Sequence, residues 1–185
     1  MEMSLTTPST FLSSIQDEEF LSIITPIIEN ETVQQMKQFR QHYDTSCFEH
    51  CLQVVYYSYL LCKKWNLDYT SVARAGMLHD LFLYNWRHSK KNLNLDGWHA
   101  FVHPKIALAN ATKLFSLNKK EQDIIRKHMW PVTIAFPRYL ESFIVTFVDK
   151  YCATHESLEF YQEKLQNKKL YRYAYIFLGL YIFCL

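Results

Sequence analysis

The apolar residues of this chain recur mostly at spacings of three and four positions, the pattern typical of helices with a buried face. Prolines and short polar stretches interrupt this pattern, so the chain divides into successive segments joined by short loops. We therefore predict helices over residues 14–24, 27–40, 46–65, 71–84, 104–115, 119–130, 138–153 and 156–169. Pro26 is expected to end the first of these helices, and Pro131 the sixth.

Three of these helices have recognisable starts. Ser46 with Glu49 three residues later is a capping box, Asp68 can cap the next helix, and Pro104 is expected to open another directly after His103. Residues 72–84 (VARAGMLHDLFLY) are almost wholly apolar. A helix of this composition is buried on all sides, so we expect it to lie at the centre of the fold.

Composition supports one helical domain. The 185 residues fit the size of a single domain, here residues 1–185 with a core of about 45–156, N-terminal helices at 14–40 and a C-terminal apolar helix at 170–185. Only three glycines are present, which disfavours a β-rich fold with many tight turns, and a 49% hydrophobic content excludes general disorder. We predict an all-α helical bundle. A net charge of +2 argues against a nucleic-acid polymer as partner.

The two ends of the chain bear on localisation and partners. The N-terminus lacks a basic segment followed by an apolar one, and the five cysteines contain no CxxC pair, so we expect a cytoplasmic protein with buried thiols. After Arg172 a 13-residue run carries no charge, but as a helix it covers only about 20 Å and cannot span a membrane. We expect it to dock on the core or on a second subunit, giving a homo-oligomer. Interfacial membrane contact and a truncated reading frame stay open as alternatives.

Two carboxylates fall inside the most apolar helices. Asp80 lies in AGMLHDLFLY and Asp149 in FIVTFVDKYC, and neither Arg74 nor Lys150, the nearest basic residues, is well placed to pair with them. A buried, unpaired charge costs several kcal/mol, so each carboxylate needs a partner or a metal ion. His79 directly precedes Asp80, which places an imidazole beside the first carboxylate.

Three further histidines occur on the flanking helices. His50, His103 and His128 lie on different predicted helices, and the steps between successive candidate ligands are 21 to 29 residues, about one helix and one loop each. Successive helices can therefore each deliver one side chain to a common centre. Four imidazoles and two carboxylates are a ligand set for one or two divalent transition ions.

These residues resemble the HD superfamily of metal-dependent phosphohydrolases. The family pattern is a His, a His-Asp doublet and a distal Asp on an all-α fold, and these positions match His50, His79-Asp80 and Asp149. Two-metal members carry two more histidines between the doublet and the last Asp, as His103 and His128 do here. The resemblance covers about residues 45–156. It does not extend to the HD-GYP subgroup, because residues 81–83 read Leu-Phe-Leu where that subgroup has Ile-Gly-Lys.

The resemblance implies a metal-activated water that attacks a nucleotide or another small phosphate ester. It makes His79 and Asp80 the catalytic pair, with Asp80 bridging two ions about 3.5–4 Å apart. Its implied ligands are His50, His79, Asp80 and Asp149 for the first ion, and His103 and His128 for the second. This set of imidazole and carboxylate ligands does not distinguish among Mn²⁺, Fe²⁺, Co²⁺, Ni²⁺, Zn²⁺ and Mg²⁺. A site with a single metal ion is an alternative.

Substrate contacts are predicted from charge and position near these ligands. The candidates are Arg87, His88, Lys91, His99 and Lys127, for which a solvated surface or a structural role is the competing interpretation. Two other functions remain open on the same ligands. One is a diiron centre that oxidises a small organic substrate with O₂, and the other is a metal-stabilised binding module without enzymatic activity.

Overall fold

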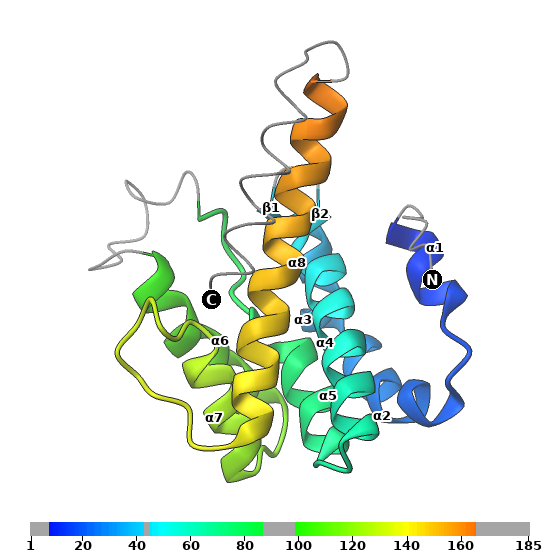
Figure 1. The fold of residues 1–185 in the computed structure, drawn as a ribbon. Coiled ribbons are helices and arrows are strands. Elements are labelled where there is room, and N and C mark those ends of the chain that lie inside the picture. Colours follow the sequence, from blue (N-terminus) through cyan, green and yellow to red (C-terminus); the bar gives the residue numbers. More distant parts are fainter. Residues whose placement is uncertain (1–7, 43–44, 87–98, 166–185) are drawn as a thin grey trace.

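The computed structural model describes residues 8–42, 45–86 and 99–165, and these form an all-α fold with one small two-stranded sheet (Figure 1). In chain order the elements are α1 (Pro8–Ser14), α2 (Glu18–Ile28), α3 (Glu31–Gln34), the 3₁₀ helix η1 (Gln35–Gln38), β1 (Arg40–His42), β2 (Thr45–Ser46), α4 (Cys47–Lys64), α5 (Tyr69–Leu78), α6 (His99–Leu114), α7 (Lys119–Lys127) and α8 (Leu140–Leu165). The prediction of an all-α fold is confirmed.

The centre of the fold is the pair α4 and α5, which share the most extensive helix–helix interface. α8 runs lengthwise between this pair and the α6–α7 pair in Figure 1 and contacts α4 and α7, while α2 packs on α5 and α6 packs on α7. From Ser71 to Leu78, every residue of α5 except Arg74 is buried. The apolar segment expected at the centre of the fold therefore lies there.

Side-chain caps explain where the helices around the site begin. Ser46 and Glu49 form the predicted capping box at α4, and Asp68 caps α5 by accepting from the Ser71 backbone N–H. Asn118 and Glu121 form a second capping box at α7. These caps fix the directions of the helices that carry the candidate ligands.

The N-terminal predictions were wrong in their boundaries. The helix predicted over 14–24 begins at Glu18, because the Asp17 side chain accepts from the Phe20 N–H, and it continues through Pro26. Burying four large apolar side chains, at about 1.5–3 kcal/mol each, outweighs the roughly 3 kcal/mol that an internal proline costs. The predicted helix over 27–40 is instead α3, η1 and β1, because Asn30 caps a new helix through the N–H groups of Thr32 and Val33.

Two helix boundaries next to the site also differ from the prediction. α5 ends at Leu78 rather than near residue 84, because the Nδ1–H of His79 donates to the Gly76 carbonyl and competes there with the Asp80 N–H. α6 begins at His99, so Pro104 lies inside it and does not open it. There the Nδ1–H of His103 donates to the His99 carbonyl and holds the first turn together.

α8 is one helix of 26 residues, whereas two helices with a break at 153–156 were expected. This stretch contains neither Gly nor Pro, and the hydroxyls of Thr154 and Ser157 bond to the carbonyls four residues earlier. The continuous helix places Glu156 two turns after Asp149 on the same side.

Several predictions fall outside the described residues. These are the substrate candidates Arg87, His88 and Lys91 and the C-terminal apolar helix at 170–185. Within the described ranges, none of the helices is long and apolar enough to cross a membrane. Cys47, Cys51, Cys62 and Cys152 are buried free thiols, as expected.

Candidate metal centre

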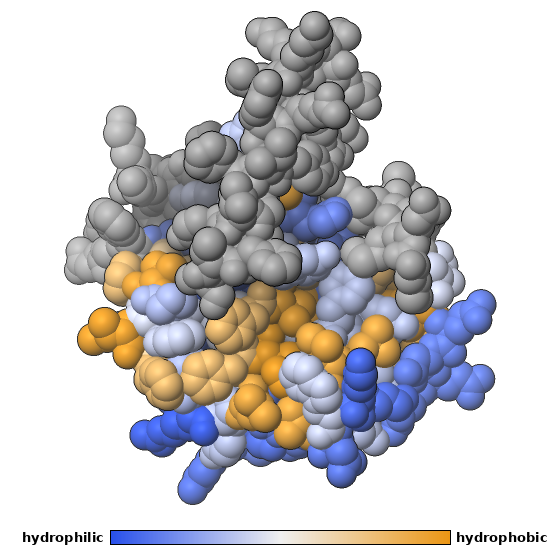
Figure 2. Space-filling view, viewed as in Figure 1, coloured by the Kyte–Doolittle hydropathy of each residue, from blue (hydrophilic) through white to orange (hydrophobic). Residues whose placement is uncertain are grey.

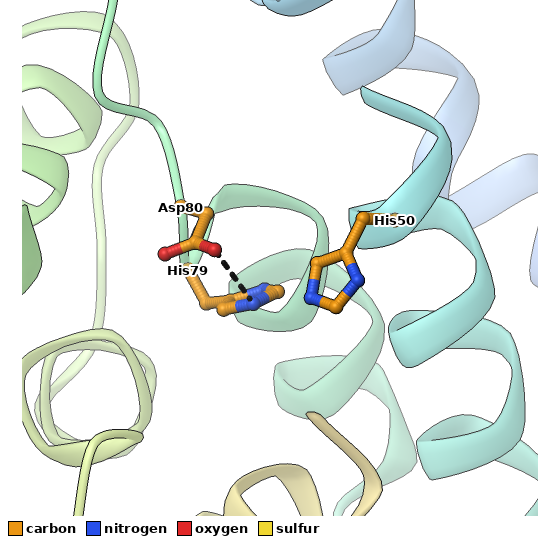
Figure 3. Close-up of side chains that lie close together, drawn as sticks. All are labelled: His50, His79 and Asp80. Carbon is orange, nitrogen blue, oxygen red and sulfur yellow. Dashed lines mark ion pairs between the residues drawn. The ribbon is translucent and has the colours of Figure 1, made fainter. Parts of the chain in front are cut away.

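Asp80 lies at the centre of a buried group of histidines. It follows α5 in the turn that His79 begins, and both residues are buried. Figure 3 shows the Asp80 carboxylate beside the His79 ring, with His50 facing the same space from α4. Ligand atoms gather in two groups that share Asp80: one with His50 and His79, the other with His103 and His128.

The second group is formed by one oxygen of Asp80 and two rings. Asp80 Oδ1 lies 3.2 Å from His103 Nε2 and 3.4 Å from His128 Nε2. These two Nε2 atoms are 2.8 Å apart. His103 comes from α6 and His128 from the end of α7, so three separate segments of the chain meet at this point.

The first group uses the other oxygen of Asp80. His79 Nε2 lies 3.5 Å from Asp80 Oδ2 and 3.7 Å from Asp149 Oδ1, which comes from α8. His50 Nε2 is 3.1 Å from the same Asp149 oxygen. The two oxygens of Asp80 therefore face different groups of imidazole nitrogens.

Hydrogen bonds fix which nitrogen each ring offers. A backbone carbonyl oxygen can only accept, so a ring nitrogen that bonds to one carries a proton. The Nδ1–H groups of His79, His103 and His128 donate to the carbonyls of Gly76, His99 and Ile125 at 2.7, 2.7 and 2.9 Å. The Nδ1–H of His50 donates to Glu156 Oε1 at 2.9 Å. A ring that carries no second proton then has its lone pair on Nε2. His50 also contacts a carboxylate through Nε2, 3.1 Å from Asp149 Oδ1, so both of its nitrogens donate when the ring is charged.

His103 Nε2, His128 Nε2 and Asp80 Oδ1 lie within 3.4 Å of one another. With both rings protonated at Nδ1 only, all three atoms are acceptors. Asp80 Oδ1 and His79 Nε2 are buried without a hydrogen-bond partner among the described residues. Buried polar atoms are normally satisfied, so these groups need a proton or a metal ion. Imidazole nitrogens held by hydrogen bonds at Nδ1 are the arrangement that metal-binding histidines show, and the residues fit a metal ion.

The charges of the metal-free cluster follow from burial and from these contacts. Burial disfavours the charge on His50, but the carboxylates of Glu156 and Asp149 outweigh it and hold the pKa of His50 well above its ordinary value. Burial likewise opposes ionisation of Asp149, yet His50 and His79 hold its pKa well below the usual range. Burial lowers the pKa of His128 despite the nearby Asp80, so this ring is neutral and available to a metal ion.

Two residues of the site were missed from the sequence. Glu156 is buried and orients His50, but it fell at an expected break between two helices. Gln41 is buried on β1 and its Nε2 donates to Asp80 Oδ2, whereas the sequence predicted a helix that ends directly before it, at residue 40. No sequence signal pointed to Gln41, whereas the absence of Gly and Pro near residue 156 favours a continuous α8.

Of the predicted substrate residues, two are described. His99 adjoins the centre: its ring stacks on His103 with centroids 4.4 Å apart, and on its other side on Trp86 at 5.1 Å. The Tyr84 hydroxyl and His99 Nδ1 share a hydrogen bond at 3.0 Å. Lys127 makes an ion pair with Asp123 at 2.5 Å on its own helix. A substrate contact for either residue stays a prediction.

A protein-family model described as HD domain matches residues 47–154, more than half of the chain. The matched segment begins at the start of α4 and contains His50, the doublet at 79–80, and Asp149. No curated protein and no solved structure gives a match.

Proposed function

The chain belongs to the HD domain family, and from this membership and the arrangement around Asp80 we propose that it is a metal-dependent phosphohydrolase. We propose as its substrate a nucleotide or another small phosphate ester. The observation that carries the proposal is one buried carboxylate shared by two groups of histidines: its Oδ1 faces His103 Nε2 and His128 Nε2, and its Oδ2 faces His79 Nε2. A shared carboxylate of this kind suits two adjacent divalent ions.

In this proposal His50, His79, Asp80 and Asp149 hold one ion, and Asp80, His103 and His128 hold a second. Bound divalent ions would lower the pKa of a water molecule and neutralise phosphate oxygens during in-line attack. Both catalytic assignments from the sequence, His79 and Asp80, are kept as part of this proposal.

The chain's own side chains position this chemistry. The bonds from Nδ1 to Gly76, His99 and Ile125 prevent the three rings from turning, so each Nε2 stays directed at Asp80. Lys150 donates to the His128 carbonyl at 2.9 Å and ties the end of α7 to α8, the helix that carries Asp149. His99 and Trp86 lie in a stack that ends at His103, which supports a place for His99 beside the substrate.

The test is phosphate release from a panel of nucleotides and small phosphate esters by protein loaded with Mn²⁺, Fe²⁺, Co²⁺ or Ni²⁺. We expect turnover of at least one substrate, its loss on chelation, and its recovery on adding metal back. Asp80→Ala should reduce turnover below detection, with its helical content unchanged by circular dichroism. Normal turnover by a folded Asp80→Ala protein contradicts the proposal.

The same preparations separate the two other functions considered for these ligands. Iron-loaded protein that consumes O₂ with an organic substrate, and shows a mixed-valent iron signal by electron paramagnetic resonance, would indicate a diiron oxygenase. Metal-replete protein that releases no phosphate from the whole panel would indicate a binding module. Either result replaces the phosphohydrolase proposal.

A further inference from the structure

Gln41 is a buried side chain at the metal centre that the six candidate ligands do not include. It is 7% exposed, and its Nε2–H donates to Asp80 Oδ2. Its Oε1 is buried without a hydrogen-bond partner among the described residues. Burying an amide with one end unsatisfied is unfavourable for folding, so stability alone does not explain why this side chain lies beside Asp80.

The backbone of β1 directs Gln41 toward the centre. Arg40 pairs with Ser46 on β2, and His42 pairs with Thr45, so two steps along β1 correspond to one step along β2. Gln41 is therefore the extra residue of a β-bulge. β1 contacts α4 and α8, which carry candidate ligands, and Figure 1 shows the strands beside these helices. Bulges are frequent next to active sites, where they redirect a side chain.

The main chain and the carboxylate of Asp80 are held by different residues. The Asp80 carbonyl accepts from the Cys47 Sγ–H at 3.1 Å and from the Phe82 N–H at 2.6 Å. These bonds leave the carboxylate able to turn about its last torsion, which has broad minima in aspartate. With the histidines protonated at Nδ1 only, the Gln41 amide is the donor to this carboxylate among the described residues. The plane of the carboxylate therefore depends on Gln41.

This plane decides how many ions Asp80 can serve. Its Oδ1 faces His103 and His128. Its Oδ2 faces His79 and accepts from Gln41. Each carboxylate oxygen has two lone pairs, so the bond from Gln41 leaves one on Oδ2 for the first ion and both on Oδ1 for the second. If both oxygens turned toward His79, the second ion would keep only two protein ligands.

The surroundings strengthen this hydrogen bond. Gln41 and Asp80 are both buried inside the bundle, and Figure 2 shows apolar side chains gathered on its surface around the lower part of α8. In an interior of low dielectric constant, a hydrogen bond to a charged carboxylate is stronger than in water. The amide can therefore hold the carboxylate against rotation.

A second contact of Gln41 leads to the other group of ligands. The Gln41 carbonyl accepts from Trp86 Nε1 at 3.3 Å. Trp86 stacks on His99, which stacks on His103. One residue of β1 is thus connected to ligands of both ions, through its side chain and through its main chain.

We infer that Gln41 is a positioning residue, whose Nε2–H holds the Asp80 carboxylate in the plane in which its two oxygens bind two different ions. The inference rests on the proposed metal centre and adds the group that makes Asp80 a bridging ligand. Gln41 acts through Asp80 and does not itself bind an ion. Its effect falls on the second ion, which has only His103 and His128 as further ligands.

Gln41→Met tests this role, because methionine has a similar length but no donor. We expect the affinity for the second Mn²⁺ to fall by about 10–100-fold, the usual range for groups that orient a metal ligand, with unchanged helical content by circular dichroism. Native mass spectrometry over a Mn²⁺ titration measures the ions bound per chain. Gln41→Asn, whose amide is one methylene too short for Asp80, should give the same loss.

Gln34→Met is the matched control. The Gln34 Nε2–H also bonds within the N-terminal part of the fold, but it donates to the Ile28 carbonyl and not to a candidate ligand. This variant should bind both ions with wild-type affinity. An equal loss of the second ion in Gln34→Met and Gln41→Met would assign the effect to general loosening of this part of the fold and overturn the inference.

The His103→Ala protein isolates the first ion. Adding Gln41→Met to it should leave the affinity for the remaining Co²⁺, and its visible absorption, unchanged. Weaker binding or an altered spectrum there would make Gln41 a ligand of the first ion and overturn the positioning role. Two ions bound with wild-type affinity in Gln41→Met would also overturn it. A wild-type protein that binds fewer than two ions would instead contradict the two-ion centre itself.

Discussion

At the scale of single residues, the protonation of each ring is set by a neighbour outside the ligand set. Three of the four histidines donate Nδ1–H to backbone carbonyls, and His50 donates to the Glu156 carboxylate instead. A carboxylate on Nδ1 raises the basicity of the imidazole and strengthens its bond to a metal ion. His50 is thus expected to be the most strongly donating ring of the four.

Glu156→Gln tests this role. The amide can still accept the Nδ1–H but lacks the charge, so we expect metal affinity to fall by about 10–100-fold while the fold is retained. Titration with Co²⁺, whose visible absorption reports its ligands, measures the affinity and shows whether the spectrum changes.

Glu141→Gln is the matched control, because Glu141 is also a buried carboxylate on α8 but pairs with Lys120. This variant should lose stability without losing metal affinity. Equal affinities for wild type and Glu156→Gln would assign Glu156 a purely structural role.

At the scale of elements, the ends of helices place the ligands. His79 and His128 both occupy the C-cap of their helices and bond to the carbonyl three residues earlier. Each helix therefore ends at its own ligand, and the next residue can turn away from the helix axis. This is how Asp80 comes to lie between the two groups of rings.

The approach of α4 to α5 is set at Gly76. A Cβ there would lie 3.0 Å from Val55 Cγ2 and 3.3 Å from its Cα. Gly76→Ala should gain about 1 kcal/mol of helix propensity but lose about 1–3 kcal/mol to overpacking, so we expect a lower free energy of unfolding and weaker metal binding at His79. Chemical denaturation of the metal-free protein measures the first effect.

Val55→Ala supplies the companion variant. It removes Cγ2, so a double-mutant cycle should show that Gly76→Ala costs less in its presence. A Gly76→Ala protein that is more stable than wild type would contradict the importance of this close approach.

The six candidate ligands could be selected from the sequence because Asp80 and Asp149 are carboxylates in apolar helices, and because His50, the doublet at 79–80, His103, His128 and Asp149 follow one another at about one helix and one loop each. Glu156 and Gln41 could not. Whether α8 is broken near residue 156 depends on tertiary packing that the apolar pattern does not contain, and a three-residue strand such as β1 has no pattern long enough to recognise. The Nδ1–H groups of His79 and His128 bond to carbonyls at the ends of α5 and α7. The apolar pattern places both helix ends at the wrong residues, so it could not predict these tautomers.

At the scale of the whole molecule, the metal-free cluster couples stability to pH. The pKa of His50 is raised, so its contribution is complete below about pH 6.5 and is lost as the pH rises toward its folded pKa. The pKa of Asp149 is lowered, so its contribution is complete above about pH 4 and is lost as the pH falls. These groups favour the metal-free fold most between those two pH values.

We therefore expect the melting temperature of the metal-free protein to decline from about pH 6.5 upward. Metal binding must displace the proton from His50, so the increase in melting temperature caused by Mn²⁺ should grow over the same range. Thermal unfolding between pH 5 and 8.5, with and without Mn²⁺, measures both trends. A metal-induced increase that is constant, or that shrinks with rising pH, would contradict this coupling.

The most direct test of the account is the number of divalent ions bound per chain, measured by native mass spectrometry of protein purified with Mn²⁺. We predict two ions in the wild type, one in His103→Ala and fewer than one in Asp80→Ala, because Asp80 faces both groups of rings. A wild-type chain that binds no ion, or an Asp80→Ala chain that keeps two, would contradict the assignment of this cluster as a metal centre.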